Sequence, residues 1–133
     1  LELFEHVKSP VRGLKECYRV LKKNGIMILS VPFLSSIHSD PHDFQRWTEE
    51  KWKKVLLEIG FKIENIEIMG RYFTVAMDMK KTFIGSLPFG IRHFFKFFYP
   101  LMDLIAKIDS TEWVKNDQKL NKFHGGYFMI LKK

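Results

Sequence analysis

The sequence is a short, basic chain of 133 residues, enough for one domain or less. Its apolar content of 46% is typical of a folded protein and excludes a disordered segment, and no run of about 18 apolar residues predicts a transmembrane helix. The net charge of +7 is explained either by a solvated basic surface or by an acidic partner, such as nucleic acid or an anionic membrane. The single Cys17 excludes an internal disulfide and is typical of the reducing cytoplasm.

The first third of the chain predicts a helix followed by a strand. Ser9 is expected to cap a helix that begins at Pro10 and ends at Asn24-Gly25. Its apolar face is formed by Val11, Leu14, Tyr18 and Leu21. Ile26-Met27-Ile28-Leu29 has no polar alternation, which predicts a strand buried on both faces, as in a parallel sheet, and ended by Pro32.

A second helix and strand are predicted after a polar loop at 33–47. Thr48 is expected to cap the helix and Gly60 to end it. The apolar face of this helix consists of Trp52, Val55, Leu56 and Ile59. Residues 61–69 predict a strand whose alternation slips by one residue at Glu64-Asn65, which indicates a β-bulge.

The remainder contains two candidate helices, a polar loop and a final apolar strand. The candidate helices cover 72–83 and 91–108, the latter interrupted by Pro100; the loop covers 111–124 and the strand 126–132. The aromatic stretch 89–99 has three interpretations: core or lid packing, an acceptor pocket for an apolar chain, or a membrane-surface helix. In the last case Arg92, His93 and Lys96 would lie at the level of lipid headgroups.

The segment from residue 4 to residue 32 resembles the second half of a class I S-adenosylmethionine-dependent methyltransferase of the type 11 kind. The resemblance is carried by Phe4-Glu5-His6-Val7, Pro10, Arg19-Val20-Leu21-Lys22-Lys23-Asn24-Gly25 and Ser30-Val31-Pro32, with Lys23-Asn24 where the family has Pro-Gly. The chain contains no Gly-x-Gly and begins at Leu1. We therefore expect the C-terminal portion of such a domain, from a longer gene or a truncated reading frame, without the Gly-rich cofactor loop.

The resemblance implies an α/β fold, namely the C-terminal part of a Rossmann-like sheet. Residues 26–31 would be its fifth strand, 61–69 its sixth and 126–132 its antiparallel seventh. Residues 1–4 would be the end of the fourth strand. Residues 1–133 would then form a partial methyltransferase domain in which 71–124 is a helical insert between the last two strands.

Titratable residues gather where the carboxyl ends of the strands are expected, and ligands of open α/β sheets bind at such ends. Glu5 and His6 would lie near the cofactor. Catalytic roles are predicted for His6, His42 and Asp43, and acceptor binding for His38, His42 and Arg46. The structural alternatives are that His6 bonds to the backbone at a helix start and that Asp43 and Arg46 pair to order the loop.

A metal site is a further hypothesis. Glu2-x-x-Glu5-His6 resembles the segment that, with a later His, holds a divalent ion in small-RNA 2′-O-methyltransferases and in a ubiquinone-pathway O-methyltransferase. Mg²⁺ or Mn²⁺ would be bound by Glu2, Glu5 and His6, with His42 or His38 as the later ligand.

The sequence thus predicts an enzyme that uses S-adenosylmethionine to methylate oxygen or nitrogen of a small molecule, a sugar or a lipid-linked glycan. One alternative is a metal-assisted 2′-O-methyltransferase acting on RNA, and another is a non-catalytic remnant that binds a partner or dimerises. The unpaired edge expected at residues 26–31 predicts a homodimer of the chain. The predicted location is the cytoplasm, and a peripheral position on a membrane is the alternative.

Overall fold

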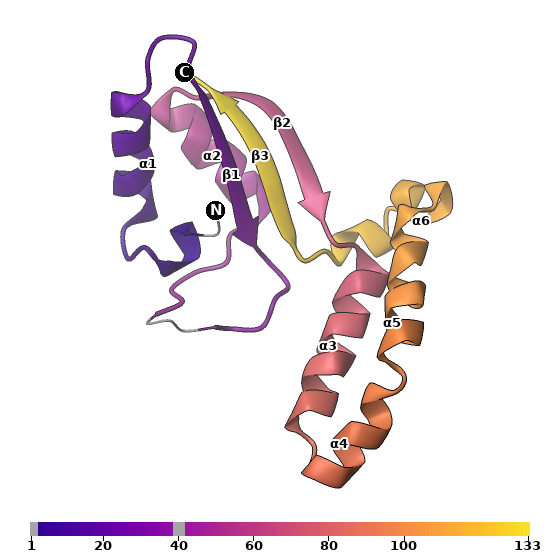
Figure 1. Cartoon of the computed structure of the whole chain (residues 1–133). Coiled ribbons are helices and arrows are strands. Elements are labelled where there is room, and N and C mark those ends of the chain that lie inside the picture. The colour runs from indigo at the N-terminus through magenta and orange to yellow at the C-terminus, as the bar shows by residue number, and fades with distance from the viewer. Residues whose placement is uncertain (1–2, 39–41) are drawn as a thin grey trace. The chain divides into compact units, whose positions relative to one another are not determined.

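A computed structural model describes residues 3–38 and 42–133 (Figure 1). The chain divides into two compact units. The sheet unit contains the chain up to Met69 together with Gly126–Lys133, and the helical unit contains Gly70–Gly125.

The sheet unit is built on three strands, β1 (Ile26–Pro32), β2 (Lys62–Met69) and β3 (Gly126–Lys132), in the order β1-β3-β2. The last strand therefore lies in the middle and runs antiparallel to both neighbours (Figure 1). The predicted strands are confirmed at all three positions. The register of β2 against β3 shifts between Ile63 and Asn65, which confirms the predicted bulge.

Two helices, α1 (Pro10–Val20) and α2 (Glu49–Ile59), supply the core of this unit together with the 3₁₀ turn η1 (Phe4–His6). Leu14 and Leu56 are fully buried, as the helical spacing of apolar residues predicts. They pack in one cluster with buried side chains of η1, of β1 and β3, and of the residue before β2: Phe4, Leu29, Val31, Phe61, Tyr127, Met129 and Leu131. Truncation of a leucine buried to this degree typically costs about 2–5 kcal/mol of stability.

The other face of β1 is exposed, which corrects the prediction that the first strand is buried on both faces. Ile26 is 61% and Ile28 is 62% exposed, whereas Leu29 and Val31 are buried. The side chains of a strand alternate between its faces, and among the described residues both α1 and α2 pack on the face of Leu29. Apolarity of the sequence shows which side chains favour burial but not which elements cover them.

The predicted helix caps are partly wrong. Neither Ser9 nor Thr48 makes a side-chain capping bond; instead the backbone N–H of Glu49 donates to the hydroxyl of Tyr127, at 3.0 Å. Gly60 ends α2 as predicted, in the left-handed conformation at φ 108°. The expected strand end at residues 1–4 is not found at Leu3 or Phe4, where the chain enters η1, and Leu1 and Glu2 lie outside the described residues.

The helical unit contains α3 (Tyr72–Ser86), α4 (Phe89–Lys96), α5 (Tyr99–Ala106) and α6 (Glu112–Asn116), with the 3₁₀ turns η2 (Lys107–Ser110) and η3 (Leu120–Lys122). In Figure 1, α5 runs back along α3 and α4 forms the connection between them. The helical prediction over 91–108, with its interruption at Pro100, agrees with the structure. Two helices occur there because Pro100 lies in the first turn of α5, where proline is tolerated. Residues 111–124 are not a plain loop, since they contain α6 and η3.

A single carboxylate holds the start of α3. The side chain of Asp109 accepts hydrogen bonds from the backbone N–H groups of Arg71 (3.0 Å), Phe73 (3.0 Å) and Thr74 (2.8 Å). The first N–H groups of a helix have no partner within it, and a negative charge at that end also interacts favourably with the helix dipole. Asp109 therefore joins η2 to α3 and closes the base of the helical unit.

We predict that Asp109→Ala destabilises the helical unit by about 1–3 kcal/mol, because it leaves three helix N–H groups without their acceptor. Urea denaturation followed by circular dichroism measures the loss. Asp103→Ala is the matched control: Asp103 is an exposed aspartate whose ion pair with Lys81 is worth little. Equal stability of the Asp109 variant and the wild type would show that water replaces the carboxylate without loss.

Candidate functional site

A buried carboxylate lies beside two imidazoles near the carboxyl end of β1. Glu5 in η1 has a side chain only 1% exposed, and neither carboxylate oxygen accepts a hydrogen bond from the described residues. The Nε2 atom of His6 lies 3.5 Å from its Oε1, and Nε2 of His38 lies 4.0 Å from the same oxygen. His38 comes from the loop that follows β1, so this contact brings the loop to η1.

The backbone orients both imidazoles in the same way. Nδ1 of His6 lies 2.6 Å from the carbonyl oxygen of His42, and Nδ1 of His38 lies 3.2 Å from that of Ser36. A carbonyl oxygen only accepts, so each Nδ1 carries the proton and donates it. Each Nε2 therefore faces the carboxylate of Glu5, and the two rings meet edge to face at 5.1 Å.

This arrangement needs a proton or a cation between its three groups. Two neutral imidazoles would turn Nε2 lone pairs toward a carboxylate that is already removed from water, and burial of an unpaired carboxylate costs several kcal/mol. A proton on one Nε2 satisfies the carboxylate, and so does a cation held between the three groups. Glu5, His6 and His38 place their ligand atoms within 4.8 Å of one another, which suits either occupant.

The loop after β1 fixes η1 by hydrogen bonds to its backbone. The N–H of Phe44 donates to the carbonyl oxygen of Glu5 at 2.8 Å. The side-chain amide of Gln45 donates to the carbonyl oxygens of Phe4 (2.8 Å) and Val7 (2.9 Å). Sequence reasoning missed Gln45, because an amide neither titrates nor follows a periodic pattern; its only signal was its place between Asp43 and Arg46.

Asp43 and Arg46 form an ion pair. Both Nη atoms of Arg46 donate to the carboxylate of Asp43, whose side chain is 4% exposed. Asp43 also accepts the backbone N–H of His38 at 3.3 Å. The hydrogen bonds from Arg46, and then the bond from His38, lower the pKa of Asp43 below its ordinary value. The pair therefore orders the segment that presents His38 to Glu5.

The remaining predicted residues lie apart from this cluster or outside the described chain. His42 contributes its carbonyl oxygen to His6, while its ring packs against Phe44 at 5.3 Å. Arg46 is turned toward Asp43, so its predicted role in acceptor binding stays a prediction. Glu2 lies outside the described residues.

The fold that carries this site is similar to the fold of known proteins. The family model of the methyltransferase domain matches residues 1–29. The solved structure of a SAM-dependent methyltransferase from Archaeoglobus fulgidus is 18% identical, with a TM-score of 0.53 over 99% of this chain and 56% of that protein. The chain has the class I methyltransferase fold. The predicted resemblance and the predicted α/β fold class, with strands equivalent to the fifth, sixth and seventh of that sheet, are thereby confirmed.

A second solved structure limits what the fold implies. The [4+2]-cyclase SpnF is 17% identical, with a TM-score of 0.54 over 99% of this chain and 47% of that protein. The chain thus spans about half the length of both solved relatives. No curated protein matches the sequence. Because one relative is described as a cyclase, the class I methyltransferase fold alone does not assign a reaction.

We predict that Asp43→Asn lowers stability at neutral pH by about 1–3 kcal/mol, the typical worth of hydrogen bonds to a charged group. The lowered pKa of Asp43 means that its contribution is complete above the ordinary value of 3.8 and is lost as the pH falls through the folded-state value. The wild type and the variant therefore converge in acid below about pH 4. Denaturant melts between pH 7 and pH 3 measure the difference.

Glu16→Gln provides the control for this experiment. Arg19 also lowers the pKa of Glu16, but Glu16 is fully exposed, so its removal changes stability little. A constant difference between Asp43→Asn and wild type across the whole pH range would contradict the assigned charge pair.

Proposed function

We propose that the chain is the acceptor-side part of a methyltransferase that methylates oxygen or nitrogen of a small molecule, a sugar or a lipid-linked glycan. The observation that carries this proposal is the position of Glu5, His6 and His38 at the carboxyl end of β1 in a sheet of the class I methyltransferase order. Ligands of open α/β sheets bind at these ends. The single Cys17 favours the cytoplasm as the working location.

The residues at this end suit proton removal from an acceptor. Nε2 of His6 faces away from the backbone carbonyl that fixes Nδ1, and its side chain is 21% exposed, so an acceptor hydroxyl or amine can reach it. When Nε2 takes the acceptor proton, the imidazolium formed lies 3.5 Å from the carboxylate of Glu5, which stabilises it. His6 is thus proposed as the general base and Glu5 as the residue that stabilises its charged form.

S-adenosylmethionine would supply the methyl group, but this chain does not hold the whole cofactor. The sequence has no Gly-x-Gly loop, which in the resembling family grips the cofactor. The outer edge of β1 has no strand partner among the described residues, and Ile26 and Ile28 beside it are exposed. We propose that a cofactor-binding half pairs with this edge, and that Glu5 and His6 then lie near the cofactor.

We predict that the purified 133-residue chain binds S-adenosylmethionine weakly or not at all in a calorimetric titration. The matched comparison is a chimera in which the cofactor-binding half of the Archaeoglobus fulgidus methyltransferase is joined ahead of Leu1. Its titration is expected to show stoichiometric binding, because β1 then regains a parallel neighbour and the Gly-rich loop is supplied. Micromolar, stoichiometric binding to the chain alone would contradict the proposal that a separate half is needed to hold the cofactor.

A metal-assisted reaction is the second candidate function, and it includes 2′-O-methylation of RNA. It is favoured by the unpaired, buried carboxylate of Glu5 and by the two Nε2 atoms directed at it. Two imidazoles and a carboxylate suit Mn²⁺ better than Mg²⁺, which prefers oxygen ligands. Such an ion would bind and polarise a hydroxyl oxygen of the acceptor. In this proposal His38 is the later ligand in place of His42.

For the metal proposal we predict that Mn²⁺ binds to the chain at one site, and that Glu5→Gln and His38→Ala each weaken binding at least about tenfold. Electron paramagnetic resonance of free Mn²⁺ measures the affinity. Glu58→Gln and His93→Ala, at exposed positions elsewhere, are the matched controls and leave binding unchanged. If the wild type takes up no Mn²⁺ at millimolar concentration, the metal proposal fails.

A non-catalytic remnant that dimerises is the third candidate. The free edge of β1 and the exposed Ile26 and Ile28 support it, since an unpaired edge with apolar side chains favours pairing with another copy. Two chains joined along β1 would form a two-fold dimer with a continuous sheet. The dimer and the cofactor-binding half compete for the same edge, so these two proposals exclude one another in a single molecule.

A further inference from the structure

The end of the helical unit formed by residues 79–102 carries an unusual density of exposed apolar side chains. This surface, called the aromatic tip below, covers the last two turns of α3, all of α4 and the first turn of α5. Phe97 is 83%, Phe89 is 72% and Phe94 is 67% exposed. Four further apolar side chains of the tip are more than half exposed: Met79, Phe83, Ile91 and Leu101. Single exposed apolar residues are ordinary, but a gathering of this kind marks an interaction surface.

The same stretch is basic and contains no acidic residue. Lys80, Lys81, Arg92 and Lys96 lie within residues 79–102, together with His93, and neither Asp nor Glu occurs there. Lys81 is paired with Asp103 just beyond the tip. Lys80 and Lys96 are exposed and form no ion pair with a described residue. The tip therefore combines apolar rings with uncompensated positive charge.

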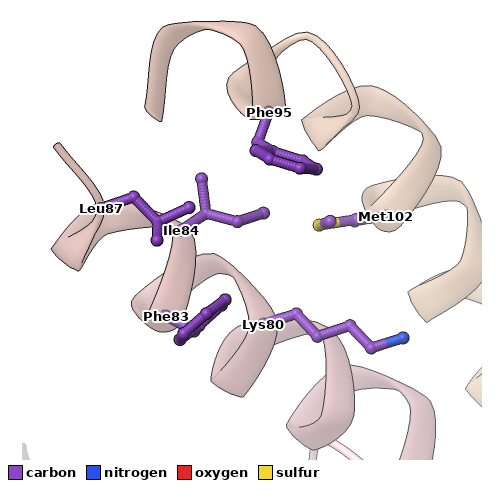
Figure 2. Close-up of a pocket in the computed structure, with 6 residues that line it drawn as sticks. All are labelled: Lys80, Phe83, Ile84, Leu87, Phe95 and Met102. Atoms are coloured by element: carbon purple, nitrogen blue, oxygen red, sulfur yellow. The ribbon is translucent and has the colours of Figure 1, made fainter. Parts of the chain in front are cut away.

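A hollow of about 200 Å³ opens between the three helices at this end (Figure 2). Phe83, Ile84 and Leu87 face Phe95 of α4 and Met102 of α5 across it, and the amine of Lys80 extends beyond one side (Figure 2). The walls offer only carbon and sulfur to an occupant. A hollow lined in this way accepts an alkyl chain, while the adjacent amine suits an anionic group attached to that chain.

We propose that the aromatic tip docks on the surface of an anionic lipid bilayer. A bilayer supplies an apolar interior for the phenylalanine rings and a negative surface for Lys80, Arg92 and Lys96 at the same time. Long lysine side chains keep their ammonium groups at headgroup level while their carbon stems lie against apolar surface. No helix among the described residues is long and apolar enough to span a membrane, so the contact is superficial.

Charge distinguishes the bilayer from a second copy of the chain. A two-fold contact through the tip would bring two acid-free, basic surfaces together, with Lys80, Arg92 and Lys96 of each copy facing those of the other. Anionic headgroups neutralise the same charges. This inference goes beyond methyl transfer and stands whether or not the chain takes part in that reaction.

The test is sedimentation of the full 133-residue chain with vesicles of phosphatidylcholine, with and without phosphatidylglycerol. Binding is expected to be about tenfold or more tighter to the anionic vesicles and to weaken as salt is raised, because headgroup attraction is screened. Equal sedimentation with both kinds of vesicle, or with neither, would overturn the proposal.

Paired variants locate the contact on the aromatic tip. Phe94→Ser with Phe97→Ser is expected to reduce vesicle binding at least about tenfold, whereas Leu57→Ser, an exposed apolar residue of α2, leaves it unchanged. Lys96→Glu is expected to reduce binding to anionic vesicles only, with Lys15→Glu of α1 as the matched control. All of these positions are exposed, so circular dichroism is expected to show an unchanged fold.

Two results would assign the surface to something else. If the control variants lose binding as strongly as the tip variants, the attraction is a general effect of net charge. If the phenylalanine variants leave vesicle binding intact but convert a dimer to a monomer in light scattering, the tip is an interface between copies. Either result overturns docking by the aromatic tip.

Discussion

The sheet unit is held together by its central strand, β3. This strand pairs with β1 on one side and β2 on the other, and its residues Tyr127, Met129 and Leu131 complete the core. Because both neighbours run antiparallel to β3, they run parallel to each other, and their carboxyl ends lie at the same edge of the sheet. The hydroxyl of Tyr127 also accepts the N–H of Glu49. The last strand of the chain therefore completes both the core and the start of α2.

Hydrogen bonds to the backbone of η1 hold the cluster around Glu5 in place, although burial of the Glu5 carboxylate is unfavourable. A carboxylate that is 1% exposed and accepts no hydrogen bond from the described residues destabilises the fold unless a proton or a cation neutralises it. The bonds of Phe44 and Gln45 to backbone carbonyl oxygens of residues 4, 5 and 7 fix the main chain that carries the Glu5 side chain. Buried titratable groups of this kind cluster at functional sites and also occur in structural ion-pair networks.

The strands and the bulge could be predicted from the sequence because both depend on local patterns, namely an apolar run and a slip in alternation. Long-range contacts could not. Thr48 has the right residue type for a cap, yet the bond to Glu49 comes from Tyr127, 78 residues away. The titratable side chains of Glu5, His6 and His38 made them candidates from the sequence alone. The pairing of Arg46 with Asp43, rather than with a ligand, could not be predicted, because it depends on how the loop folds.

What occupies the space facing Glu5 decides between the candidate reactions, because the fold is shared by relatives described as a methyltransferase and as a cyclase. A free Nε2 on His6 makes the pair an acid–base device, in which Glu5 stabilises the charged imidazole formed when an acceptor loses its proton. A divalent cation would occupy the Nε2 lone pairs of His6 and His38 and so remove His6 as a base. The two mechanisms therefore exclude each other at one atom, Nε2 of His6, although both are compatible with the same buried carboxylate.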